Sequence, residues 1–227
     1  MAYVNEVFPR VFYRMVPTGV VLSTLDVQLR RSTPEEMKRI HEETLSHARS
    51  FAQAGCDVVF LGGAPTNLSH GWDHLLRVLA DLERQFGVPV TSNATAQNKA
   101  MLTLGAKRVG VVHPFSSMIV GRHDEQLRAS GLIPAGCIGA DSVVEEYHLI
   151  PESRAYDLGV ALKHRNPDLD TIFFACPHWY VTDAIEPLER DLGVNVVAAI
   201  QAIIWEGLRL AGIDERIKGY GRLLRDH

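Results

Sequence analysis

The sequence predicts an α/β protein with parallel sheets, built from two related halves. Short apolar runs that end at Gly or Pro alternate with helical stretches of about a dozen residues, a pattern typical of successive βαβ units. Two segments also repeat: DVVFLGG at 57–63 matches DTIFFAC at 170–176, and LERQFGVPV at 82–90 matches LERDLGVNV at 188–196. Because the repeat occurs only twice, it indicates two similar lobes and not a solenoid. We therefore expect parallel sheets with helices on both faces.

The expected strands are apolar runs bounded by turn residues. They span residues 20–29, 56–62, 88–91, 108–112, 170–176 and 194–197, and 134–144 is either irregular or a strand. The fourth of these strands is expected to end at His113-Pro114. Residues 1–14 show no clear period, so no element is expected there.

The expected helices begin at capping residues or proline and mostly end at glycine. The clearest start is STPEE at 32–36, where Thr33 caps the helix, Pro34 lies in its first turn and Glu36 completes a capping box. Thr182 is expected to cap another helix in the same way. The helices span residues 33–54, 72–86, 94–104, 116–129, 151–164 and 182–191, and a last one ends at residue 210.

Composition excludes several classes of protein. The 227 residues are 46% hydrophobic, enough to bury a full core in one large domain or in two intimate lobes. The net charge of −4, with acidic and basic residues interspersed, argues against binding to nucleic acid or a membrane surface. No apolar run reaches the roughly 18 residues of a membrane span, and the N-terminus lacks the apolar core of a signal peptide. Three cysteines without a CxxC pair fit a reducing compartment, so we expect a cytoplasmic protein.

The candidate chemistry centres on Cys176, the last residue of an expected strand. In open α/β sheets, ligands bind at the carboxyl ends of the strands. A thiol there, near the start of a following helix, can have a lowered pKa and act as a proton donor or nucleophile. Pro177 has no N–H, so an anion at this edge must be bound by later amides or by side chains. The alternative is a buried structural thiol, since free cysteine is among the most buried residue types.

Other polar residues are expected at the same edge of the sheet. His113 and His178 follow strand ends, where an imidazole could orient a carboxylate or relay a proton near neutral pH. The alternative for both is a surface histidine or a satisfied core histidine. The remaining candidates are neutral donors suited to a carboxylate or an enolate, namely Thr66, Asn67, Ser69 and Asn93.

Metal and nucleotide sites are not expected. His70 and His74 are four residues apart, but Gly71 lies between them and no third ligand is evident. The Gly62-Gly63 pair belongs to neither GxGxxG nor GxxxxGK[ST], which excludes a dinucleotide site and a P-loop.

Six segments spread over nearly the whole chain carry a family resemblance. They are AGCDVVFLGG, GVPVTSNATA, KRVGVVHPF, FFACPHW, TDAIEPLERDLGVNVV and GYGRLL. Together they resemble the aspartate/glutamate racemase superfamily, in its arylmalonate decarboxylase and maleate isomerase branch. The resemblance implies two pseudo-symmetric α/β lobes with the active site between them, no cofactor or metal, and reaction of a small carboxylic acid at the carbon next to its carboxylate. We assign residues 1–112 and 198–227 to the first lobe and 113–197 to the second; a homo-oligomer is compatible with this interpretation.

The pair of catalytic positions in the family is only half retained. The racemases place one cysteine from each lobe on opposite faces of the reacting carbon, whereas this chain has Cys176 in one lobe and Gly63 in the other. One thiol can protonate an enolate from one face only. Decarboxylation needs no base, because loss of CO₂ itself generates the enediolate. The resemblance therefore implies a cofactor-independent lyase of the arylmalonate decarboxylase type, in which Cys176 protonates and Gly63 leaves room for a substituent.

Other positions depart from the decarboxylase pattern. The two hydroxylic residues that follow this glycine in the decarboxylases are Ala64 and Pro65 here, and Phe115 replaces the tyrosine expected after the turn. Asn5 matches an asparagine of the maleate isomerases, which use two cysteines. The family's first strand would lie upstream of Asn5.

These departures keep two alternatives open. One is a maleate isomerase-like cis-trans isomerase in which Cys176 adds to a double bond, and the other is a protein that binds a small carboxylate without turnover. Racemase activity ranks last, because a histidine would have to replace the second thiol. The expected substrate-binding residues are Asn5, Gly63, Ala64, Thr66, Asn93, His113, Phe115, Pro177 and His178.

Overall fold

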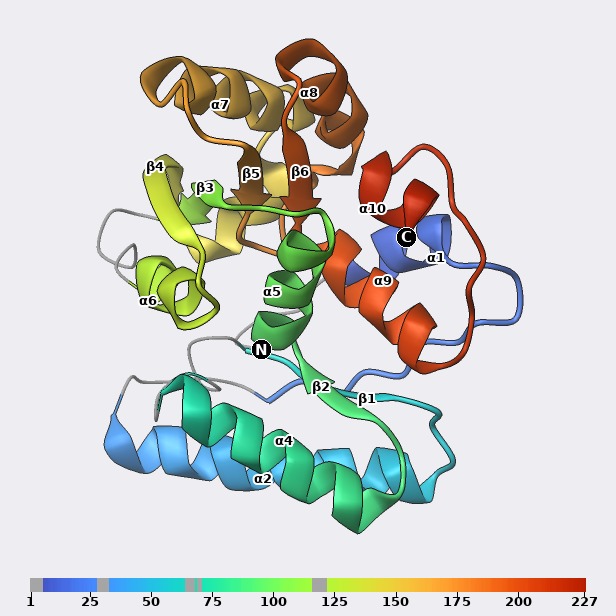
Figure 1. Cartoon of the computed structure of the whole chain (residues 1–227). Coiled ribbons are helices and arrows are strands. Elements are labelled where there is room, and N and C mark those ends of the chain that lie inside the picture. Colours follow the sequence, from blue (N-terminus) through green and yellow to red (C-terminus); the bar gives the residue numbers. More distant parts are fainter. Residues whose placement is uncertain (1–5, 28–32, 64–67, 69–70, 116–121) are drawn as a thin grey trace.

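A computed structural model describes residues 6–27, 33–63, 68, 71–115 and 122–227. It has the expected mixed α/β architecture, with two parallel sheets and helices around them (Figure 1). The elements follow the chain in the order α1 (Val7–Met15), α2 (Pro34–Gln53), β1 (Val59–Leu61), α4 (Trp72–Phe86), β2 (Val90–Ser92), α5 (Asn93–Thr103), β3 (Arg108–Phe115), α6 (Arg122–Ala129), β4 (Ile133–Ser142), η2 (Val144–Leu149), α7 (Glu152–Arg165), β5 (Thr171–Phe174), η3 (Thr182–Ala184), α8 (Ile185–Leu192), β6 (Asn195–Ala198), α9 (Ala199–Leu210) and α10 (Gly221–Asp226).

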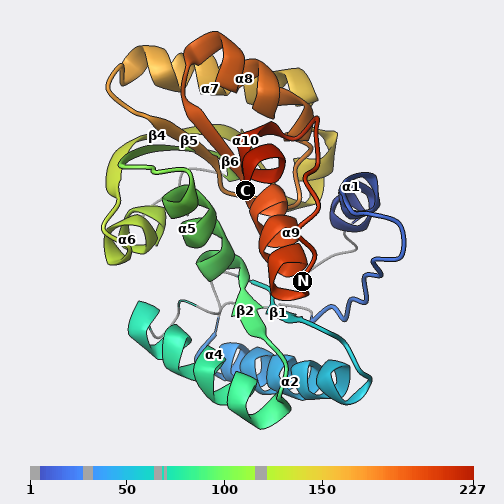
Figure 2. The ribbon, with the colours of Figure 1, turned by 45° about the vertical axis from the view of Figure 1, so that its right-hand side comes forward.

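The smaller sheet consists of β1 and β2, with Val59 opposite Val90 and Leu61 opposite Ser92. Helices α2 and α4 lie side by side against it (Figures 1 and 2). The start of α2 is as expected, because the Glu36 N–H donates to Thr33 Oγ1 at 3.3 Å. The residues that fill this core come from both helices and both strands, and include Leu75, Leu79 and Leu82 of α4.

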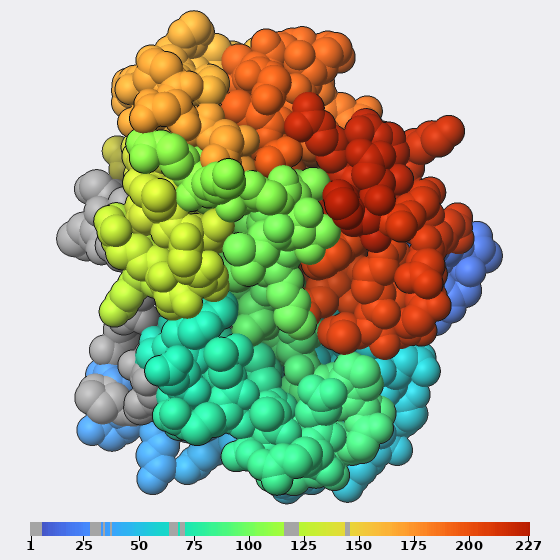
Figure 3. Space-filling view, viewed as in Figure 1, coloured from blue at the N-terminus to red at the C-terminus, as the bar shows by residue number. Residues whose placement is uncertain are grey.

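The larger sheet has the strand order β4-β3-β5-β6, with every pair parallel. Helices α7 and α8 cover one face, and α5, α6 and α9 lie on the other (Figures 1 and 2). A glycine in β3 permits the close packing of α7, because a Cβ at Gly110 would lie 2.8 Å from side-chain atoms of Leu162 and Leu169. In the space-filling view, α5 spans the front of the molecule between its upper and lower parts, beside α9 (Figure 3).

Helix α1 lies where the sequence showed no period. It buries Val7, Val11 and Met15, which are spaced by four residues and face α9. Phe8 and Phe12 join the same core beside this stripe. The nine residues of α1 are too few to show a clear period in the sequence.

The strand expected at 20–29 is wrong for 20–27, and 28–29 lie outside the described residues. Val21 and Leu25 are 77% and 51% exposed, so this stretch does not bury an apolar face against a sheet. The expected stop at His113-Pro114 is also wrong, since β3 continues to Phe115. Backbone groups two residues apart in a strand point to the same side, and the carbonyl of Val112 points toward β5. The N–H that Pro114 lacks would therefore point toward β5 beyond its last residue, so the proline costs no hydrogen bond of the sheet.

The structure also settles the type of one expected element and corrects the start of another. The stretch that was either strand or irregular is β4, a parallel edge strand paired with β3. Thr182 does not cap α8; it begins the short 3₁₀ helix η3 that precedes α8. Only the second part of the helix expected at 116–129 is described, as α6.

The division into lobes stays a prediction. The proposed boundary after residue 112 falls within β3, and buried residues of α1, α5 and α9 belong to the core of the larger sheet. Among the described helices, none combines the length and apolar character that a membrane span requires.

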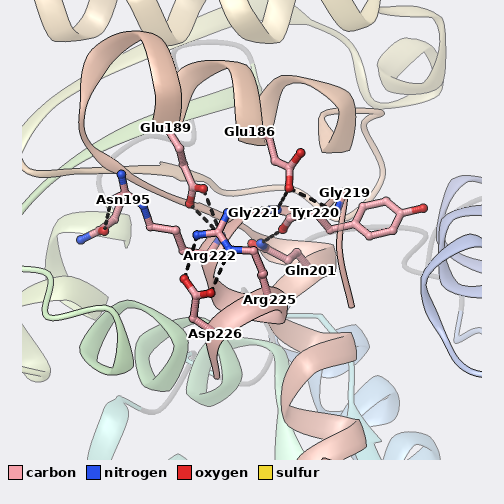
Figure 4. Close-up of polar contacts among 10 residues, drawn as sticks. All are labelled: Glu186, Glu189, Asn195, Gln201, Gly219, Tyr220, Gly221, Arg222, Arg225 and Asp226. Carbon is pink, nitrogen blue, oxygen red and sulfur yellow. Dashed lines mark hydrogen bonds and ion pairs between the residues drawn. The ribbon is translucent and has the colours of Figure 1, made fainter. Parts of the chain in front are cut away.

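The C-terminal helix α10 is held by carboxylates of α8 (Figure 4). The backbone N–H of Arg222 donates to both oxygens of Glu189 at 3.0 and 3.2 Å, and Glu186 accepts from the N–H of Gly219 at 3.2 Å. Gln201 of α9 donates to the carbonyl of Tyr220. These bonds satisfy the amides at the start of α10 and explain how GYGRLL fixes the chain end.

Gly221→Ala is expected to lower the free energy of unfolding by about 2–4 kcal/mol. Gly221 has φ of 82°, and a Cβ there would overlap Cγ2 of Ile185, a completely buried side chain of α8. Gly219→Ala is the matched control, because its φ is also positive, at 93°, but a Cβ there meets no atom within 4 Å. Chemical denaturation should show a loss of only about 1 kcal/mol for the control. Equal losses in the two variants would contradict the packing argument.

Candidate active site

Cys176 lies at the carboxyl edge of the larger sheet, two residues beyond the end of β5. The N–H of Ala175 still donates to the carbonyl of Val112 at 3.0 Å, so the chain remains beside β3 up to this point. The thiol is only 3% exposed, and its Sγ accepts a hydrogen bond from the backbone N–H of His178 at 3.4 Å. In Figure 1 the carboxyl ends of β5 and β6 point toward the part of the molecule that holds β1 and β2.

The expected lowering of the thiol pKa is wrong for this structure. Burial raises the pKa of Cys176 to about 12, and the hydrogen bond from the His178 amide offsets this only in part. The thiol is therefore protonated at neutral pH. This is the form that a proton donor needs, whereas a nucleophile would need the thiolate.

The loop after Cys176 is fixed by aromatic packing. Trp179 is almost completely buried and meets the ring of Phe174 edge to face, with centroids 6.0 Å apart. Burial lowers the pKa of His178 to about 4, so its imidazole is neutral at pH 7. His178 thus offers a carboxylate a neutral hydrogen bond and not a positive charge, and Pro177 between them is half-buried.

His113 and Phe115 lie together at the end of β3, on the strand next to β5. Their rings are stacked with centroids 5.4 Å apart, and Phe115 in turn stacks on His123 of α6 at 5.8 Å. Tyr147 and Phe173 add edge contacts to this stack. The Phe115 ring therefore stacks on two imidazoles, at interplanar angles of 12° and 11°.

Both imidazoles of this stack are neutral at pH 7. Burial lowers the pKa of His113, and burial together with the neighbouring His113 lowers the pKa of His123 to about 4. Sequence reasoning missed His123 because it stands in RHDEQLRA, a segment that otherwise looks like a solvated helix face. No local signal could have found it, since its partners come from β3 and β5.

The residues expected from the first half of the chain are only partly described. Gly63 lies two residues beyond β1 with φ of 79°, and Asn93 is the half-buried first residue of α5, directly after β2. Asn5, Ala64 and Thr66, like Asn67 and Ser69, lie outside the described residues.

The described candidates share one arrangement. Cys176, His113 and Phe115 lie at the carboxyl ends of two neighbouring strands of the larger sheet, while Gly63 and Asn93 follow the two strands of the smaller sheet. The carboxyl ends of β2 and of β5 and β6 point toward each other, with α5 and α9 beginning between them (Figure 1). A protonated thiol, neutral imidazoles and a neutral amide can bind a carboxylate and deliver one proton.

Sequence comparison identifies relatives of two kinds. The family model for arylmalonate decarboxylase matches residues 12–224. Arylmalonate decarboxylase from Bordetella bronchiseptica is 31% identical over 194 residues, which cover 84% of this chain and 80% of that protein. Maleate isomerase from Geobacillus stearothermophilus is 25% identical over 206 residues, covering 85% of this chain and 78% of that protein.

Solved structures of the same two kinds share the fold. A glycine-to-cysteine mutant of arylmalonate decarboxylase, in the sulfate ion associated form, gives a TM-score of 0.78 at 30% identity and covers 86% of this chain and 85% of its own. Nocardia farcinica maleate cis-trans isomerase with a covalently bound succinylcysteine intermediate gives a TM-score of 0.84 at 20% identity and covers 98% of this chain and 95% of its own. At this identity the likeness is one of fold alone. The chain therefore belongs to the arylmalonate decarboxylase family, within the aspartate/glutamate racemase superfamily of enzymes.

Proposed function

We propose that this enzyme decarboxylates a small, substituted malonate-type dicarboxylic acid and that Cys176 protonates one face of the resulting enediolate. The observation that carries the proposal is a single protonated thiol at the carboxyl edge of the larger sheet, with a glycine at its counterpart in the internal repeat. Similarity to arylmalonate decarboxylase over most of the chain supports the reaction class.

The proposed reaction has two steps. The bond between the α-carbon and one carboxylate breaks, CO₂ leaves, and the bonding electrons remain in an enediolate. The Cys176 Sγ–H then donates its proton to the α-carbon, forming the C–H bond and leaving a thiolate. The N–H of His178, 3.4 Å from Sγ, stabilises that thiolate until water returns a proton to it.

The retained carboxylate is assigned to neutral donors. Asn93 and His178 are the described donors for it, and Asn5 and Thr66 are proposed to complete the site. Charge that develops on the enediolate is best stabilised by such fixed dipoles in a site that excludes water. Gly63 and Ala64 leave space for the substituent, and Phe115 and Pro177 offer it apolar surface.

Three free cysteines fit a reducing compartment, so we place the reaction in the cytoplasm.

A substrate screen in deuterated water tests the proposal. Substituted malonates, maleate and amino acids are incubated with the enzyme and followed by NMR. Decarboxylation should incorporate one deuterium at the α-carbon and give a single product enantiomer. Exchange of an amino acid without loss of CO₂ would point to racemase chemistry and contradict the proposal.

A maleate isomerase-like reaction is the second candidate, supported by 25% identity to a maleate isomerase over 85% of the chain. In that reaction the Cys176 sulfur would add to the double bond, which requires the thiolate. The raised pKa of Cys176 disfavours this route. Conversion of maleate to fumarate with a trapped adduct on Cys176 would establish it. If no acid in the screen is turned over, binding of a small carboxylate without catalysis is the function that stays.

A further inference from the structure

We propose that Glu206, a buried residue of α9, is a positioning residue that fixes Asn93 at the start of α5 through the hydroxyls of Thr91 and Thr95. The inference rests on the proposed function only in that Asn93 is taken as a substrate contact. Helices α5 and α9 pack against each other (Figures 1 and 2). Glu206 contacts Thr91 of β2, two residues before the start of α5.

Both oxygens of the buried Glu206 carboxylate have bonding partners on or next to α5. It is 3% exposed, and Thr91 Oγ1 donates to its Oε2 at 3.0 Å while Lys99 Nζ pairs with its Oε1. Burying a carboxylate is energetically unfavourable unless such partners satisfy it. Its two oxygens are therefore committed to α5 and to the strand end that precedes α5.

The hydrogen bonds continue from Thr91 into the first turn of α5. Thr91 gives its single hydroxyl proton to Glu206, which leaves its oxygen as an acceptor. The one hydroxyl proton of Thr95 is shared between this oxygen, 2.9 Å away, and the carbonyl of Ser92, also at 2.9 Å. Thr95 Oγ1 also accepts from the N–H of Ser92 at 3.0 Å, and Ser92 Oγ accepts from the N–H of Thr95 at 3.3 Å. Asn93 lies within this closed turn, so its backbone is set by the chain of bonds that begins at Glu206.

The internal repeat offers a comparison within the same molecule. Continuing the match of 82–90 with 188–196 without a gap pairs Thr91 with Val197, Ala100 with Glu206, and Asn93 with Ala199. Val197 and Ala100 are completely buried, and their elements β6 and α5 are in contact. The equivalent positions in the other half of the repeat are therefore buried and apolar.

This asymmetry argues that packing alone does not explain Glu206. The polar pair occurs only beside the helix that begins with asparagine, and the apolar pair occurs beside the helix that begins with alanine. Because α9 directly follows β6 of the larger sheet, the bond from Glu206 ties Asn93 to the sheet that carries Cys176. We infer that the bond fixes the amide relative to the thiol.

The test compares four variants on phenylmalonate: Glu206→Ala, Glu206→Gln, Asn93→Ala and the double alanine variant. Glu206→Ala should lower kcat/KM by about tenfold to a hundredfold, the size expected when a contact is misplaced by an ångström. Glu206→Gln should recover most of the loss, because its amide oxygen still accepts from Thr91. In the Asn93→Ala background, the loss caused by Glu206→Ala should disappear. Independent, additive losses would overturn the inference.

Hydrogen exchange gives a readout that does not depend on turnover. The backbone amides of residues 92–95 should exchange faster in Glu206→Ala than in the wild type or in Glu206→Gln. Thr91→Val, which copies Val197 and leaves no cavity, should show the same effect if Glu206→Ala fails to fold. Unchanged exchange in both variants would refute the positioning role. Absence of decarboxylation by the wild type would instead refute the proposed function.

Discussion

Cys176→Ala is expected to reduce the decarboxylation rate by about a thousandfold while the protein remains folded. Removing the thiol leaves protonation of the enediolate to water, which is not held at the α-carbon as a positioned donor would be. The substitution removes one buried sulfur atom, so the loss of stability should be on the order of 1 kcal/mol. Product formation followed by NMR, with thermal unfolding followed by circular dichroism, separates the two effects.

Cys56→Ala and Cys137→Ala are the matched controls. Cys56 precedes β1, and Cys137 is an exposed residue of the edge strand β4, so neither lies at the carboxyl end of a strand. Both should retain wild-type turnover. A Cys176→Ala variant with full activity would remove the basis of the single-thiol mechanism, and so would a control that loses activity as severely.

Local sequence patterns predicted an element correctly where its buried residues recur at a regular spacing. Helix α4 runs from Trp72 to Phe86 as expected, because its leucines recur on one face and Gly87 ends it in the left-handed conformation at φ 69°. The limits of β3 could not be read in this way. Whether Pro114 ends the strand depends on which neighbour its N–H would have faced, and only the sheet order decides that.

The same distinction applies to the candidate site. Cys176 and Gly63 could be found because the repeat aligns them and because both follow an apolar strand. His123 and Glu206 could not. His123 acquires its role from rings on β3 and β5, and Glu206 meets Thr91 across 115 positions of sequence. Polar residues that act through tertiary contacts look like surface residues in the sequence alone.

Acidification from pH 7 toward pH 4 is expected to lower the free energy of unfolding by roughly 3–5 kcal/mol. Burial lowers the pKa of His123 and of His178 to about 4 from their ordinary value of 6.5, and it lowers the pKa of His113 as well. Between those two values the unfolded chain binds protons that the folded chain excludes. Stability is therefore complete above about pH 6.5 and is lost as the pH falls toward 4.

One buried carboxylate acts in the opposite direction. Burial raises the pKa of Glu189, so protonation of this group favours the folded state, but only as the pH approaches the range where carboxylates titrate. The histidines should therefore dominate the first part of the decrease. Urea denaturation at a series of pH values measures the slope directly.

His123→Leu isolates the contribution of the aromatic stack. Leucine keeps apolar contact with Phe115 and Phe173 but binds no proton, so the slope of unfolding free energy against pH should fall by about one proton, or 1.4 kcal/mol per pH unit. His148→Gln is the matched control, because this imidazole is exposed and its replacement should leave the slope unchanged. A wild-type stability that does not vary between pH 7 and pH 5 would contradict the neutral, buried state of these imidazoles. It would mean that the stack which holds Phe115 at the end of β3 accepts a charge without loosening.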